Sequence, residues 1–172
     1  MYTIIAILDT GVNEHSELQG RLVPGYDYVY NDNDPNDVQG HGTACAGIAA
    51  AKGNNNSGIA GVCWDCSIMP VKVLGDDGYG DDATIGAAIQ QTASQGVQII
   101  SMSLGGGGYN SYLDNSIGWI TNYSETNNIF LSGRLAGFQG SGPNVAGTIF
   151  GLLTILSFYF YRKTGKKIYT NL

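Results

Sequence analysis

Short apolar runs alternate with helix-like segments along the N-terminal part of the chain. The runs at 3–8, 67–74 and 97–106 are rich in β-branched residues and lack the regular polar alternation of a half-exposed strand. Such runs are typical of strands that are buried on both faces of a parallel sheet. The segments at 42–51 and 83–96 carry small or helix-favouring side chains, and the second ends at a glycine, so the pattern predicts two helices.

The alternation of strands and helices predicts an α/β domain. We expect a three-layer architecture in which helices cover both faces of a mostly parallel sheet. A chain of 172 residues fills one ordinary domain and leaves no room for a second of normal size. The pattern weakens after Gly108, which suggests a sheet-bearing part at 1–108, an irregular junction at 109–142 and an apolar helix with a basic tail at 143–172.

The stretch at 145–161 is apolar apart from Thr and Ser, and a basic run from Arg162 to Lys167 follows it directly. Seventeen residues of helix reach roughly 26 Å, which is marginally enough to cross a bilayer. Because basic residues favour the cytoplasmic side of a membrane, the tail would lie inside and the domain outside. We therefore expect a C-terminal membrane anchor, although no signal peptide precedes the first apolar run.

Charge and cysteine content argue against two classes of function. The formal net charge is −6, and the few Lys and Arg side chains cluster near the C-terminus, so the chain lacks the basic face that nucleic-acid binding requires. Cys63 and Cys66 form a CxxC pair, but no second CxxC or HxxxH completes a zinc set, and we predict no metal ligands. The pair is expected to form a disulfide that stiffens its loop, or to pack as two thiols, in preference to a redox function.

Two residues suggest acid–base chemistry. Asp9 directly follows the first apolar run, and His41 lies where the first predicted helix begins. An aspartate that orients a histidine, which then acts as a general base, is a common catalytic arrangement. Taken alone, each residue also fits a structural role, Asp9 as a turn or capping residue and His41 as a loop histidine.

Five motifs give these two residues a context. AILDTGV, HGTACAGIAAA, GIAGV, PVKVL and SMSLGG occur in this order and together resemble the subtilisin-like serine proteases, the subtilases of peptidase family S8, over residues 3–108. The resemblance implies an α/β fold and a serine endopeptidase that hydrolyses peptide bonds of a peptide or protein substrate through an Asp, His, Ser triad. Asp9 and His41 match the first two members of that triad.

A further part of the resemblance concerns substrate binding. The family segment whose backbone pairs with an extended peptide is matched here by Ser103, Leu104, Gly105 and Gly106. Such pairing adds the peptide as one more strand, which main-chain hydrogen bonds then hold. Without the resemblance, the same residues would be an ordinary strand end followed by a glycine turn.

The third member of the triad has no match. The stretch GFQGSGPNVAG at 137–147 aligns with the family motif around the serine and places Gln139 at the nucleophile position. A glutamine amide has no ionisable hydroxyl or thiol that a histidine could activate. We therefore expect a chain that is truncated or rearranged after the SLGG motif. On this alignment, residues 143–161 would be the remnant of the family's buried serine-bearing helix instead of a membrane anchor.

Two functional hypotheses follow and stay open at this point. The first is a serine endopeptidase of the subtilisin-like family. The alternative is a catalytically inactive, membrane-tethered pseudo-protease or peptide-binding fragment. The family is secreted, which implies an extracellular or cell-surface protein, and residues 145–161 would add a membrane contact where this segment is an anchor and not a buried helix.

The resemblance also raises a structural calcium ion. A loop that looks like the calcium-bearing region of some subtilases holds four acidic residues: Asp27, Asp32, Asp34 and Asp37. The stretch GNNNSGI at 53–59 resembles another calcium loop. Oxygen-rich loops suit this hard cation, but solvated turns of the same composition need no metal.

Overall fold

The computed structural model describes residues 3–105 and 129–133, together with eight positions between them: 111, 115, 116, 118, 119, 120, 123 and 127. Several sequence-based expectations fall elsewhere. Gly106, Gln139, the apolar segment at 145–161 and most of the junction at 109–142 lie outside the described residues. Within the described part, no helix is long and apolar enough to span a bilayer.

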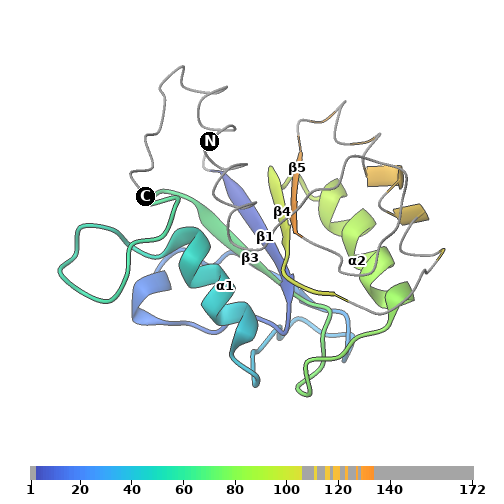
Figure 1. Ribbon diagram of the computed structural model, residues 1–172, viewed down its shortest axis with the longest axis horizontal. Coiled ribbons are helices and arrows are strands. Elements are labelled where there is room, and N and C mark those ends of the chain that lie inside the picture. The colour runs from blue at the N-terminus through green and yellow to red at the C-terminus, as the bar shows by residue number, and fades with distance from the viewer. Residues whose placement is uncertain are drawn as a thin grey trace.

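A parallel sheet forms the centre of the molecule (Figure 1). Among the described residues it has five strands in the order β2-β3-β1-β4-β5. Their bounds are β1 Ile4–Asp9, β2 Tyr26–Asp27, β3 Ser67–Lys72, β4 Ile99–Met102 and β5 Phe130–Gly133. All neighbouring strands run parallel, which confirms the sheet type that the apolar runs predict.

The central strand β1 is buried on both faces, and its alternate side chains enter two different cores. Ala6 and Leu8 pack with side chains of the helix α2 (Asp82–Ser94). Ile5 and Ile7 pack with alanines of the helix α1 (His41–Ala50) and with Leu18 of the short 3-10 helix η1 (Ser16–Leu18). Helices therefore cover both faces of the sheet, which confirms the three-layer α/β architecture (Figure 1).

The helix boundaries follow from local chemistry. The Asp81 carboxylate accepts a hydrogen bond from the backbone N–H of Thr84 at 2.9 Å, which caps the start of α2. Shortly after the end of α2, Gly96 adopts a positive φ of 79° that other residues rarely adopt. Helix α2 thus begins one residue before the predicted segment and ends two residues before that segment does.

Two strands differ from what the apolar pattern suggests. Strand β2, which the apolar runs do not predict, covers only two residues, and the Asp27 carboxylate accepts hydrogen bonds from the N–H groups of Val29 and Tyr30 in the turn that follows it. Strand β5 arises inside the stretch expected to be irregular, where a short apolar run pairs with β4. The chain after Cys63 is fixed by a disulfide to Cys66, one of the two structural alternatives for this pair.

Candidate active site

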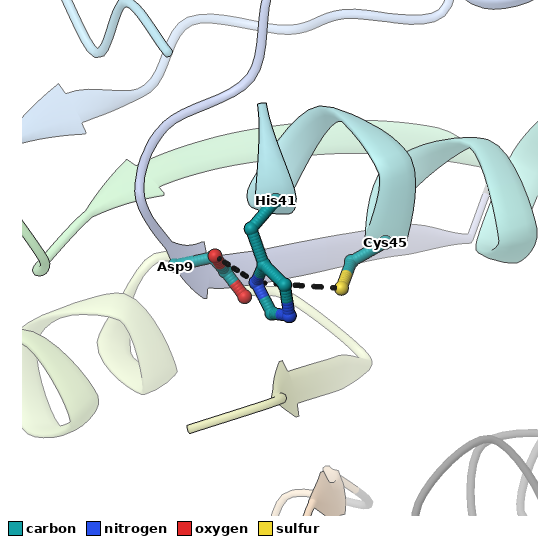
Figure 2. Close-up of side chains that lie close together, drawn as sticks. All are labelled: Asp9, His41 and Cys45. Carbon is teal, nitrogen blue, oxygen red and sulfur yellow. Dashed lines mark hydrogen bonds and ion pairs between the residues drawn. The ribbon is translucent and has the colours of Figure 1, made fainter. Parts of the chain in front are cut away.

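Asp9 and His41 meet at the carboxyl end of the central strand. Asp9 is the last residue of β1 and is fully buried, whereas His41 is the first residue of α1 and its side chain is 46% exposed. The Asp9 Oδ1 atom lies 2.7 Å from His41 Nδ1 and also accepts the backbone N–H of Thr10 at 2.8 Å. Figure 2 shows the carboxylate against one edge of the imidazole. A carboxylate in this place favours the tautomer with a proton on Nδ1, which leaves Nε2 as the free base.

A second buried aspartate joins the two elements that carry this pair. One oxygen of Asp37 accepts the hydroxyl of Thr10 at 2.8 Å and the N–H of Gly40 at 2.7 Å. The other oxygen accepts both the N–H of Thr43 at 2.8 Å and its hydroxyl at 2.6 Å. Asp37 therefore ties the residue after Asp9 to the first turn of α1.

The hydrogen bonds around Asp37 also set its ionisation. Burial disfavours the charged carboxylate, but hydrogen bonds from Thr43, Gly40 and Thr10 outweigh this effect and hold the pKa of Asp37 below its usual value. From the sequence, Asp37 is only a calcium candidate, and its role in joining Thr10 to the first turn of α1 is not predicted. The N-cap residue of α1 is Gly40, so the usual capping pattern does not single out Asp37 in the sequence.

Glycine at position 42 allows α1 to approach β1 closely. A Cβ atom on Gly42 would lie 2.1 Å from the carbonyl oxygen of Gly11 and 3.0 Å from the Cβ of Asp9. The N–H of Gly42 also donates to the hydroxyl of Thr10 at 3.0 Å. Any larger side chain would push the helix, and His41 with it, away from the end of the strand.

A buried lysine supports the same strand end from the other side. Lys72, the last residue of β3, is 1% exposed, and its Nζ donates to the carbonyl oxygen of Thr10 at 2.7 Å. It also forms an ion pair with Asp76 at 2.9 Å. A buried charge needs such partners, and here one of them is the backbone directly after Asp9.

The predicted peptide-binding segment lies beside this site. Met102 of β4 pairs with Leu8 of β1, so Ser103 follows at the level of Asp9. Ser103 and Gly105 are exposed, and Leu104 packs in part against the core on the α2 side. Two of its three described residues are therefore exposed next to the Asp–His pair.

Cys45 is a site residue to which sequence analysis gave no role. It lies one turn after His41 on α1, and its Sγ atom is 3.9 Å from His41 Nδ1. Burial and the charge of Asp9 raise the pKa of the Cys45 thiol to about 11. The thiol is therefore protonated at neutral pH and is a weak nucleophile in this state.

Three carboxylates of the acidic loop accept hydrogen bonds from the protein itself. Asp27 and Asp37 use their carboxylates on backbone N–H groups and hydroxyls of the protein itself. One oxygen of Asp32 accepts the N–H of Asp34 at 2.8 Å. In the described part of the chain, these carboxylates do not gather into a group that could hold a metal ion. Their chemistry is that of turn and capping residues.

Comparisons with known proteins match this geometry to one family. The model described as "Subtilase family" matches residues 2–136. The chain is 46% identical over 119 residues to Thermitase of Thermoactinomyces vulgaris, which covers 69% of this chain and 43% of that protein. It is 41% identical over 108 residues to the Cell wall-associated protease of Bacillus subtilis (strain 168), covering 61% of this chain and 12% of that protein. The solved structure of Sphericase superposes with a TM-score of 0.67 at 36% identity, covering 76% of this chain and 44% of that chain. The chain thus spans less than half the length of these relatives.

The four hydrogen bonds that Asp37 accepts predict a specific response to Asp37→Asn. The variant loses the negative charge and places an amide NH₂ against backbone donors, so we expect a loss of about 2–3 kcal/mol in the free energy of unfolding, measured with urea. Asp34→Asn, an exposed change in the same loop, is the matched control and should cost less than about 1 kcal/mol.

The stability difference between the parent chain and Asp37→Asn should also depend on pH. Because the pKa of Asp37 is lower in the folded state than the unfolded value of about 3.9, its contribution is full above that value and is lost as the pH falls through the lower folded pKa. The stability difference between the parent chain and Asp37→Asn should therefore shrink below about pH 4. A difference that stays constant from neutral to acidic pH would contradict this account.

Gly42→Ala tests the contact between strand and helix. The added methyl group meets the Gly11 carbonyl, so we expect a loss of about 1–3 kcal/mol in thermal unfolding experiments. Gly47→Ala lies on the same helix, and its new methyl group would meet only Ile59, at 3.8 Å. This substitution should therefore be neutral or stabilise the fold by up to about 1 kcal/mol. Equal effects of the two substitutions would argue against the close approach.

Proposed function

Because the chain belongs to the subtilase family, we propose that it supplies the aspartate and the histidine of a serine endopeptidase that hydrolyses peptide bonds. The observation that carries the proposal is the 2.7 Å contact between Asp9 Oδ1 and His41 Nδ1. The aspartate is buried and the histidine is half exposed, which suits a pair that orients a base toward a bound substrate.

The proposed mechanism assigns one step to each residue. Asp9 accepts the Nδ1 proton of His41 in a hydrogen bond and holds the ring in the productive tautomer. His41 Nε2 then takes the proton from an attacking hydroxyl and later gives it to the leaving amine. The imidazolium that forms between these two transfers is stabilised by the buried carboxylate. Asp37 and Gly42 contribute by holding the start of α1, and with it His41, close to Asp9 at the end of β1.

The source of the hydroxyl decides between the two hypotheses. Gln139, which aligns with the family's serine, lies outside the described residues, and its amide has no hydroxyl to offer. Catalysis by this chain therefore needs a hydroxyl from a different residue. The exposed residues Ser103 and Gly105, beside the Asp–His pair, favour peptide binding as the second candidate function.

An extracellular location is part of the proposal. The Cys63–Cys66 disulfide suits an oxidising compartment, because disulfides are rare in reducing ones. One of the relatives is named as a cell wall-associated protease, which points the same way. A membrane anchor at 145–161 stays a prediction, since this segment lies outside the described residues.

Family membership also suggests a calcium ion, and the loop at 53–59 fits one better than the acidic loop does. This loop folds around Glu17, a buried residue whose Oε2 accepts Asn55 Nδ2 at 3.4 Å. Asn54, Asn56 and Gly58 all have positive φ values. One buried carboxylate with amide oxygens is a donor set for calcium, which would link η1 to the loop after α1.

Labelling with a fluorophosphonate probe tests the catalytic proposal. An active site should label, and His41→Ala should slow the labelling by at least about 10³-fold because the general base is lost. The chain has two histidines, and His15→Ala is the matched control, which should label as the parent does. A parent chain that never labels would overturn the endopeptidase proposal. Saturable binding of extended peptides to the purified chain would then support the second candidate, and its absence would exclude that candidate too.

Thermal unfolding with and without CaCl2 tests the calcium proposal. At calcium concentrations near a hundred times Kd, binding should raise Tm by about 5 °C or more. Glu17→Gln should abolish this shift, whereas Glu14→Gln, an exposed acidic neighbour, should keep it. A shift that is the same in all three proteins would place the ion elsewhere.

A further inference from the structure

One oxygen atom at the centre of the site has no partner. Asp9 is fully buried, and its Oδ1 already accepts Thr10 N–H and contacts His41 Nδ1. Its Oδ2 has no hydrogen-bond partner among the described residues. A buried carboxylate oxygen without a partner costs free energy, so this atom is a candidate ligand for a group that the Asp–His pair alone does not provide.

Cys45 brings a third ligand atom to the same place. Residues four apart lie on one face of a helix, and α1 therefore directs His41 and Cys45 to the same side. Figure 2 shows the imidazole of His41 between Asp9 and Cys45, with its Nδ1 joined by dashed lines to the carboxylate and to the sulfur. One ligand atom from each of the three residues lies within 4.8 Å of the others. Cys45 is a free cysteine, unlike Cys63 and Cys66.

The spacing is close to that of a tetrahedral zinc site. Zinc bonds of about 2.0–2.3 Å place neighbouring ligand atoms about 3.3–3.7 Å apart. The observed separations from His41 Nδ1 are 2.7 Å to Asp9 Oδ1 and 3.9 Å to Cys45 Sγ, on either side of that range. These two separations need to change by roughly 0.5 Å each, and the carboxylate oxygen and the sulfur would also have to move closer together, from a separation within 4.8 Å to about 3.5 Å.

The donor types select the kind of metal. A nitrogen, a sulfur and one carboxylate oxygen suit zinc or a similar transition metal, whereas calcium and magnesium prefer oxygen ligands throughout. The half-exposed His41 leaves a path to solvent, and a water molecule can fill the fourth position. Two negative ligands, the Asp9 carboxylate and a Cys45 thiolate, would balance the charge of a divalent cation.

We propose that Asp9, His41 and Cys45 form a three-residue site for Zn²⁺ at the end of β1. On binding, the Cys45 thiol gives its proton to water and the sulfur bonds to the metal. The metal takes the place of the proton on His41 Nδ1, and a neutral imidazole then carries its proton on Nε2. Binding itself does not rest on the proposed peptidase function.

The consequence for hydrolysis does rest on the proposed function. With its proton on Nε2, the imidazole cannot accept one from an attacking hydroxyl, so the metal-bound site cannot act as a general base. Zinc would therefore be a reversible inhibitor whose binding competes with the hydrogen bond between Asp9 and His41.

Titration of the full chain with Co²⁺, a coloured substitute for Zn²⁺, tests the site directly. We expect a thiolate-to-cobalt charge-transfer band in the near ultraviolet, which added Zn²⁺ then removes. Cys45→Ser and Cys45→Ala should both lose this band, and Asp9→Asn should weaken binding by at least about 10-fold, with folding verified by circular dichroism. His15→Ala should bind as the parent does.

Two results would overturn the proposal. One is a folded parent chain without a charge-transfer band, and the other is a band that survives in both folded Cys45 variants. These readouts are independent of labelling by the fluorophosphonate, so failure of the peptidase proposal leaves the metal test intact. If the chain does label, Zn²⁺ should slow labelling of the parent at least about 10-fold more than labelling of Cys45→Ala, and equal inhibition of both proteins would also contradict the site.

Discussion

The geometry of the site depends on a buried carboxylate that lies outside the Asp–His pair. Asp37 accepts four hydrogen bonds, which connect Thr10 at the end of β1 to Gly40 and Thr43 at the start of α1. Charge-assisted hydrogen bonds of this kind are stronger than neutral ones, whereas an ion pair with a half-exposed partner such as His41 contributes about 1 kcal/mol or less. The short Asp9–His41 distance is therefore mainly a result of the fixed junction between strand and helix, and only secondarily of the attraction between the two side chains.

The sequence predicts most of the sheet and, in the site, Asp9 and His41 but not the roles of Asp37 and Cys45, and each outcome has a physical reason. Buried parallel strands need continuous apolar runs, so β1, β3 and β4 are visible in the sequence, and Asp9 is found because it ends such a run. The length of β2 is not visible, because it is set by hydrogen bonds of the Asp27 side chain. The roles of Asp37 and Cys45 are not visible either, since each depends on a contact with Asp9 or Thr10 that only the folded chain creates.

Two chemistries converge on a single nitrogen atom. His41 Nδ1 donates a hydrogen bond to Asp9 in the proposed peptidase site and would bind the metal in the proposed zinc site, so the two states exclude each other. The proposed zinc site depends on Cys45, which lies one helical turn from His41 and adds a sulfur ligand to the carboxylate oxygen of Asp9 and the nitrogen of His41. A family fold can thus keep one reaction geometry and gain a second ligand preference through one side chain.

The position of β1 in the sheet has a consequence for synthesis of the chain. β1 leaves the ribosome before its partners β3 and β4, which begin only at Ser67 and Ile99. At usual translation rates, β4 is synthesised on the order of ten seconds after β1. During this time the backbone of β1 is not fully paired and its apolar side chains are not fully covered. Such long-range parallel pairing is slow and exposes the chain to aggregation. A factor that shields nascent apolar segments should therefore raise the yield of folded protein.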